Sequence, residues 1–141
     1  MKVLLAIDGS TYSKKMLAYL VTHDTTFASS GNEFTLFTAH PALPARARSA
    51  VGKDIADAFH ADATEKVLAP AAKFLLRHGI NAKSAWKVGQ AGELIARFAE
   101  AGKFDLLLMG SHGHGALANL VMGSVATQVL AHCKVPVLLV R

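Results

Sequence analysis

The chain has 141 residues, about the length of one domain. Apolar residues make up 52% and charged residues 18% of it, which excludes a disordered chain because such chains need low hydrophobicity to stay unfolded. The net charge of +5 first suggests a nucleic-acid partner, but the basic residues are scattered and no basic stretch is interleaved with aromatic residues. We therefore expect no nucleic-acid binding.

Four short apolar runs, together with a weaker one at residues 82–88 that is polar in part, alternate with longer amphipathic stretches along the chain. Continuous apolar runs of four to eight residues are typical of strands that are buried on both faces of a parallel sheet. The sequence therefore predicts five strands, at residues 3–7, 34–39, 82–88, 106–109 and 135–140.

The stretches between these runs place apolar residues at helical spacing. They predict four helices, with apolar faces over residues 16–21, 55–68, 94–98 and 120–129. The second helix is expected to end near residue 78, and Pro70 is expected to kink or split it. Residues 41–52 are expected to form the one extended loop.

Alternating strands and helices predict an α/β fold, a doubly wound, three-layer domain with an open sheet of five parallel strands and helices on both faces. We expect a single domain over residues 1–141. In such sheets ligands bind beyond the carboxyl ends of the strands, where the strand order reverses. The last run, from Val135 to Val140, is expected at a sheet edge, because Pro136 cannot donate a ladder hydrogen bond.

No apolar run approaches the roughly 20 residues of a membrane span. The first seven residues resemble the start of a signal peptide, but Asp8 ends the apolar stretch well short of the roughly 7–15 residues that a secretory signal needs. Cys133 is the only cysteine, which fits a reducing compartment, and we interpret it as a buried structural thiol. The sequence thus favours a cytoplasmic protein without membrane insertion.

A glycine-rich segment, residues 110–124, follows the fourth predicted strand directly. Glycine lets backbone N–H groups approach an anion without a Cβ in the way. Gly123 and Ser124 then open a helix, whose first turn offers unpaired N–H groups to a phosphate. The Ser124 hydroxyl either donates to that phosphate or caps the helix. A tight turn without any ligand is the alternative interpretation of these glycines.

Two common phosphate motifs do not account for this segment. The P-loop pattern does not occur in the chain. The dinucleotide pattern occurs by letter at Gly113, Gly115 and Ala118, but it follows the fourth strand instead of the first. No Asp or Glu follows Asp105, so the acidic residue that would bind the ribose is missing, and we reject dinucleotide binding.

These glycines form the motif Gly110-x-x-Gly113, followed by nine residues and then Gly123-Ser124. Their spacing resembles the ATP-binding branch of the universal stress protein family. Asp8 after the first strand and the last run of the chain support the resemblance, which covers the whole chain. It implies a stress-response regulator that binds ATP, AMP or ADP with slow or no hydrolysis. It also implies a homodimer through Val135 to Val140.

The resemblance implies a role for individual residues as well. Asp8 would hydrogen-bond the ribose hydroxyls. The phosphates would lie against Gly110, Gly113, Gly123, Ser124 and Val125. The adenine pocket would be lined by Ala6, Ile7, Ala39, Val88 and Gly89. Met109 and His112 complete the candidate site.

Other chemistry at these residues stays open. His112 and His114 flank Gly113, but no cysteine or second carboxylate has the spacing of a zinc site nearby, which favours contact with phosphate or solvent. Asp8 is the candidate ligand for a Mg²⁺ ion carried in by the nucleotide. One alternative is an ATPase or nucleotide-dependent enzyme that uses His112 or Asp8. Another is a dimeric interaction module without nucleotide.

Overall fold

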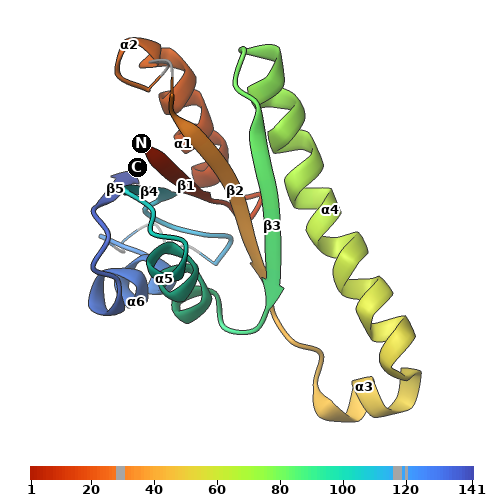
Figure 1. Cartoon of the computed structure of the whole chain (residues 1–141). Coiled ribbons are helices and arrows are strands. Elements are labelled where there is room, and N and C mark those ends of the chain that lie inside the picture. Colours follow the sequence, from red (N-terminus) through yellow and green to blue (C-terminus); the bar gives the residue numbers. More distant parts are fainter. Residues whose placement is uncertain (28–30, 116–118, 120) are drawn as a thin grey trace.

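The computed structural model of the chain describes residues 1–27, 31–115, 119 and 121–141. Five strands and six helices alternate along these residues, as Figure 1 shows. The strands are β1 (Lys2–Ala6), β2 (Glu33–His40), β3 (Ala82–Val88), β4 (Leu106–Gly110) and β5 (Val137–Val140). The helices are α1 (Thr11–Thr22), α2 (Asp24–Phe27), α3 (Ala45–Val51), α4 (Lys53–Arg77), α5 (Ala91–Ala101) and α6 (Ser124–His132).

The five strands form one parallel sheet in the order β3-β2-β1-β4-β5. The predicted α/β fold with an open five-stranded sheet is confirmed, and β5 lies at an edge as expected. The chain moves outward from β1 through β2 to β3, and returns on the other side through β4 to β5. The strand order therefore reverses between β1 and β4, which is where a ligand site is expected in an open parallel sheet.

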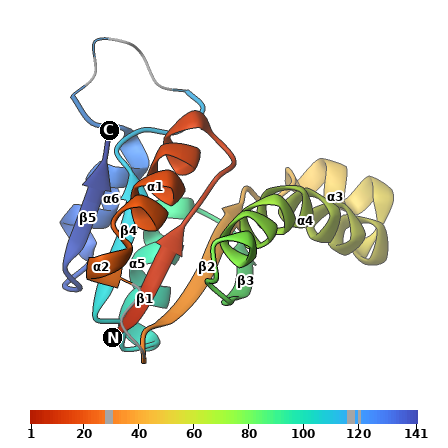
Figure 2. The same ribbon diagram turned by 90° about the horizontal axis from the view of Figure 1, so that it is seen from above.

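Helices cover both faces of the sheet (Figure 2). Val3 and Leu5 of β1 belong to a core cluster with residues of α1 and α4, whereas Leu4 and Ala6 belong to a second cluster with α5 and α6. Successive side chains of a strand point to opposite faces, so both sets are buried only when the sheet is covered twice. This explains why β1 appears in the sequence as an unbroken apolar run.

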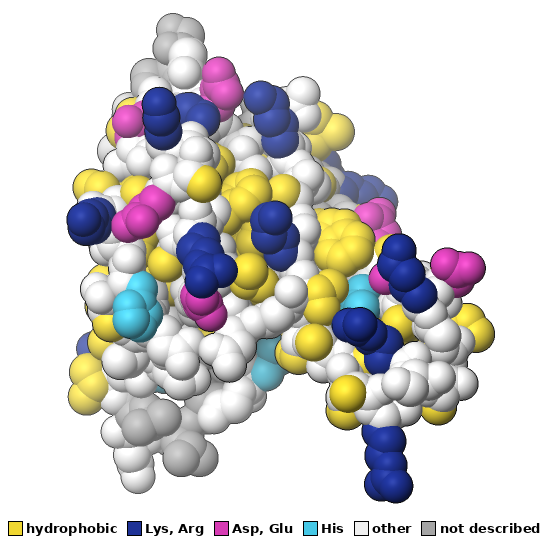
Figure 3. Space-filling view, turned by 60° about the horizontal axis from the view of Figure 1, so that its bottom comes forward, with side chains coloured by type: hydrophobic (Ala, Val, Ile, Leu, Met, Phe, Trp, Pro, Cys, Tyr) yellow, Lys and Arg dark blue, Asp and Glu magenta, His cyan; other side chains and the backbone are white. Residues whose placement is uncertain are grey.

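Residues 41–52 are not an extended loop, because they contain α3. In Figure 1, α3 and the first turns of α4 extend beyond the carboxyl ends of β2 and β3. Figure 3 shows this projecting part at the right, with several Lys and Arg side chains on its surface. Ile55 and Phe59 lie on this part of α4 and are exposed, so the predicted apolar face is buried only further along the helix.

Pro70 does not split α4, which runs without interruption from Lys53 to Arg77. The proline removes one intrahelical hydrogen bond. Leu68, Ala71 and Leu75 are buried on either side of it, and this packing holds the helix together where local propensity opposes it.

The last helix begins at Ser124, later than the periodicity predicts. Val121 is 79% exposed, and Leu120 lies outside the described residues. Cys133 follows the helix and is only half-buried, so the prediction of a fully buried thiol is wrong. Burial still raises the pKa of this thiol, which makes it a weaker nucleophile at neutral pH.

None of the helices described here is long and apolar enough to cross a membrane.

Candidate functional site

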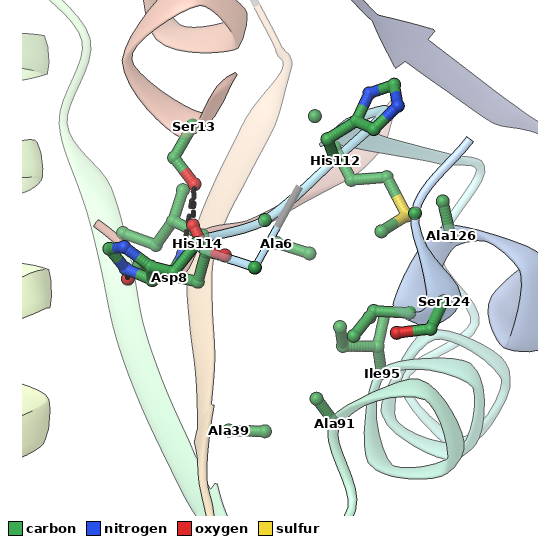
Figure 4. A pocket seen from close by; sticks show the side chains of 17 residues that line it. Ala6, Asp8, Ser13, Ala39, Ala91, Ile95, His112, His114, Ser124 and Ala126 are labelled. Atoms are coloured by element: carbon green, nitrogen blue, oxygen red, sulfur yellow. Dashed lines mark hydrogen bonds between the residues drawn. The ribbon is translucent and has the colours of Figure 1, made fainter. Parts of the chain in front are cut away.

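A cavity of about 260 Å³ opens at the carboxyl edge of the sheet, between the ends of β1 and β4. Its walls come from the β1–α1 turn, the end of β2, the start of α5, the glycine segment after β4 and the first turn of α6. Figure 4 shows Asp8 and His114 on one side of this cavity, and Ser124 and Ala126 on the other.

Asp8 is held rigidly by the turn that joins β1 to α1. Its Oδ1 atom accepts hydrogen bonds from the backbone N–H of Ser10 at 2.9 Å and from the Ser13 hydroxyl at 2.8 Å. Its own N–H donates to Ser13 Oγ at 2.9 Å. Gly9 has φ +78°, a left-handed conformation that lets the chain turn sharply after the strand. The turn therefore fixes one carboxylate oxygen and directs the other towards the glycine segment.

The glycines of the spaced motif stand where the surroundings leave little or no room for a side chain. A Cβ at Gly113 would lie 2.8 Å from Asp8 Oδ2, and one at Gly110 would lie 2.6 Å from Cβ of Tyr12. A Cβ at Gly123 would lie 3.1 Å from Cα of His112. The backbone of residues 110–113 thus passes directly over the β1–α1 turn.

The first turn of α6 faces the same cavity. Gly123 is the N-cap residue, and its N–H donates to the Ser111 carbonyl at 2.7 Å. No side chain caps this helix, so the interpretation of the Ser124 hydroxyl as a cap is not supported. In Figure 4 the Ser124 hydroxyl instead points into the cavity. The N–H groups of the first turn of a helix lack intrahelical partners, so this wall suits an anion.

Two histidines close the cavity near the glycine segment. His112 is 9% exposed, stacks on Tyr12 with ring centroids 4.8 Å apart, and is hydrogen-bonded through Nδ1 to Ser111 Oγ at 2.8 Å. His114 donates from Nε2 to the Asp8 carbonyl at 2.6 Å. These contacts tie the glycine segment to the β1–α1 turn.

The opposite end of the cavity is apolar. Ala39 from β2, Ala91 and Ile95 from α5, and Ala6 from β1 line it. Among the described residues, no Lys or Arg is part of the lining. The cavity therefore offers an apolar wall, one carboxylate and, across from that carboxylate, a helix start that suits an anion.

Most of the predicted site residues lie together in this cavity. They are Ala6, Ile7, Asp8, Ala39, Met109, Gly110, His112, Gly113, Gly123, Ser124 and Val125. Val88 and Gly89 are not part of the lining. Val88 lines a neighbouring hollow beside Ala42 and His60, and Gly89 donates its N–H to the His40 carbonyl. Their contact with adenine stays a prediction.

The sequence interpretation missed several lining residues, namely Ser13, Ala91, Ile95, Gly115 and Ala126. Ser13 carried a signal, because a hydroxyl in the first turn of a helix often bonds to the residues before it. Ala91 and Ile95 carried none, since only tertiary packing decides which part of α5 meets the cavity.

Metal binding by Asp8 also stays a prediction. Over residues 1–27, 31–115, 119 and 121–141, no three His, Cys, Asp or Glu residues come together as a metal site would require. Asp8 alone can supply a carboxylate oxygen to a Mg²⁺ ion that a ligand brings with it, because Mg²⁺ often takes only one or two protein carboxylates.

Comparison with known proteins gives a consistent result. The family model described as "Universal stress protein family" matches residues 1–141. A universal stress protein of Thermus aquaticus is 29% identical over 144 aligned residues, which cover 99% of this chain and 97% of that protein. A universal stress protein of Synechocystis sp. is 43% identical over 74 residues, and this match covers 52% of the chain but only 26% of the Synechocystis protein.

Solved structures show the same fold. Protein MJ0577 of Methanocaldococcus jannaschii superposes with a TM-score of 0.80 at 26% identity, over 99% of this chain and 94% of that chain. Three more distant structures contain a nucleotide. A universal stress protein in complex with cAMP has a TM-score of 0.69 at 22% identity, over 100% of this chain and 97% of that chain. An Arabidopsis thaliana family member with AMP bound has a TM-score of 0.67 at 18% identity, over 99% of this chain and 90% of that chain. An Archaeoglobus fulgidus protein in complex with dAMP has a TM-score of 0.67 at 18% identity, over 100% of this chain and 98% of that chain. Because these three chains have only 18% to 22% sequence identity to this one, their similarity shows a shared fold and no more.

Replacement of Ser13 by alanine tests how Asp8 is held. The change removes a donor to Asp8 Oδ1 and an acceptor for the Asp8 N–H, in a residue that is 5% exposed. We expect Ser13→Ala to lower the free energy of unfolding in urea by about 1–3 kcal/mol, the cost of leaving a buried polar group unpaired. Ser49→Ala, at an exposed position on α3, is the matched control and should change it by less than about 0.5 kcal/mol. Equal effects of the two changes would contradict the role given to Ser13.

Proposed function

Because the chain belongs to the universal stress protein family, we propose that the cavity between β1 and β4 binds an adenine nucleotide, ATP or AMP, and that the protein acts as a nucleotide-dependent regulator. The observation that carries the proposal is the start of α6, which faces Asp8 across a cavity with an apolar wall. An adenine nucleotide has three parts that match these walls: an apolar ring system, a ribose diol and a phosphate.

Each part of the nucleotide has a matching wall. The phosphate lies against the backbone N–H groups of Ser124, Val125 and Ala126 and the Ser124 hydroxyl. The ribose hydroxyls donate to the free oxygen of Asp8. The adenine ring lies against the apolar wall at Ala39 and Ile95. The cAMP, AMP and dAMP complexes of structures with the same fold support an adenine nucleotide as the ligand.

Slow or absent hydrolysis is part of the proposal. Efficient phosphoryl-transfer sites use a Lys or Arg to stabilise charge on the phosphate and a base to orient the nucleophile. The lining described here contains neither cation, and its one carboxylate, Asp8, is engaged by Ser10 and Ser13. A site built this way holds a nucleotide better than it turns one over. We propose that bound nucleotide changes what a protein partner meets at the glycine segment, and that this happens in the cytoplasm.

We also propose that β5 pairs with β5 of a second copy. Leu107 N–H donates to the carbonyl of Pro136, just before β5, and Ser111 N–H donates to the carbonyl of Val140, at its end, so both carbonyls are directed to β4. The backbone N–H and C=O groups of successive strand residues point to alternate sides of the strand. Those of Val137 and Leu139 are therefore directed outward at the sheet edge. An uncovered edge of apolar residues is an aggregation hazard that a dimer removes.

Titration calorimetry with ATP and with AMP tests the nucleotide site. We expect the native chain to bind, and Gly113→Val to bind at least about 100-fold more weakly, a loss of about 2.7 kcal/mol. The reason is that the new Cβ would lie 2.8 Å from Asp8 Oδ2 and would displace the carboxylate that receives the ribose.

Gly115→Val is the matched control for this experiment. Among the described residues, no atom lies within 4 Å of a Cβ built at Gly115, although this glycine also lines the cavity. Its affinity should stay within about threefold of the native value, and thermal unfolding should show all three proteins folded. A native chain that gives no heat with millimolar ATP or AMP would overturn the nucleotide site.

Light scattering during size-exclusion chromatography tests the dimer. We expect the native chain to have twice the mass of a single chain. Leu139→Pro removes an outward N–H from β5 and should give a monomer, whereas Leu139→Val trims the same side chain, keeps the N–H and should stay dimeric. A native monomer, or a Leu139→Pro protein that remains dimeric and folded by circular dichroism, would show that β5 is not the interface.

A further inference from the structure

A second and larger cavity, of about 500 Å³, lies on the sheet face covered by α1 and α4. Its floor is formed by the buried side chains of Ile7, Leu17 and Ala71. Val67 and Phe74 of α4 form its side. A volume of this size is typical of sites that take small organic ligands, which lie between about 300 and 1,000 Å³.

The rim of this cavity is positively charged. Lys14 of α1 and Lys66 and Arg77 of α4 line it, and its described lining contains no Asp or Glu. Lys66 pairs with Asp62 at 2.9 Å, but both side chains are largely exposed, and such surface pairs are weak. Lys14 and Arg77 form no ion pair with the described acidic residues. The charge of the rim is therefore available to a ligand.

Pro70 gives this wall an unusual composition for a helix. It lines the cavity, and because it has no N–H it cannot donate to the carbonyl of Lys66 one turn earlier. A proline inside a helix is destabilising. The Pro70 ring adds apolar surface beside Val67 and Phe74. Any other residue at this position would donate its N–H to a helical hydrogen bond.

We propose that this second cavity binds an amphiphilic carboxylate, with its hydrocarbon part against Leu17, Val67 and Phe74 and its carboxylate beside Lys14 and Lys66 at one end of the cavity. The floor removes apolar surface from water, which drives the binding of the chain. The two lysines select the charge of the head group. A polar anion without a hydrocarbon part leaves the floor empty, and a cationic amphiphile is repelled by the rim.

The second cavity is distinct from the first, although the two share Ile7 and Ser13 as parts of their walls. Asp8 and the start of α6 line only the first cavity, whereas the α4 residues line only the second. The proposal therefore does not depend on nucleotide binding and stands or falls by its own experiment.

Titration calorimetry of the full chain with three ten-carbon amphiphiles tests this proposal. Decanoate, decanol and decyltrimethylammonium share one hydrocarbon chain and differ in the charge of the head group, and each is used below its micelle concentration. We expect decanoate to bind one molecule per chain, decanol to bind at least about tenfold more weakly, and the cation not to bind. No binding of decanoate, or equal binding of all three, would overturn the proposal.

Variants then place the ligand. The double change Lys14→Glu and Lys66→Glu, at two exposed positions, should weaken decanoate binding at least about tenfold. The double change Lys15→Glu and Lys73→Glu is the charge-matched control, because these two lysines are exposed on the same two helices but are not in the lining, and it should bind decanoate like the native chain. A loss of binding in this control equal to that of the first double variant would mean that only overall charge matters and would overturn the proposal.

Two further variants separate the two cavities. Val67 is half-buried in the wall of the second cavity, and in Val67→Trp the larger side chain fills that cavity. This variant should lose decanoate binding while circular dichroism shows that it remains folded. Gly113→Val, which alters the first cavity, should bind decanoate normally. The opposite pattern, with binding lost in Gly113→Val and kept in Val67→Trp, would place the carboxylate in the first cavity and overturn the assignment.

Discussion

The close passage of residues 110–113 over the β1–α1 turn is the constraint on which the site depends. Asp8 is fixed by Ser10 and Ser13, and the backbone at Gly113 passes so near its free oxygen that no Cβ fits between them. Gly110 and Gly123 allow the same approach at either end of the segment. Because of this passage, the start of α6 is carried across the edge of the sheet to face Asp8, and a cavity forms between them.

Much of the fold follows from patterns within the sequence. The apolar runs located all five strands because a doubly covered sheet buries both faces of each central strand, as β1 shows. The glycine spacing located the site because close backbone approach leaves few other residues possible at Gly110, Gly113 and Gly123. These are local requirements, and a sequence records them directly.

Other features depend on packing between distant segments, and the sequence did not reveal them. Ala91 and Ile95 enter the cavity only because α5 lies beside α6 against β2. Pro70 was expected to kink or split a helix, but the buried residues around it keep α4 in one piece. Val121 fits the helical periodicity and is nevertheless exposed ahead of α6, because the helix begins only where Gly123 caps it.

A crystal structure of the chain with AMP is the most direct test of the central claim, which is that Asp8 and the start of α6 together form a nucleotide site. The account predicts ribose oxygens within about 2.6–3.2 Å of the Asp8 carboxylate and phosphate oxygens at the same range from the N–H groups of Ser124 to Ala126. The adenine ring should lie against the apolar wall at Ala39 and Ile95. AMP bound elsewhere, or bound here with its phosphate turned away from α6, would contradict the account.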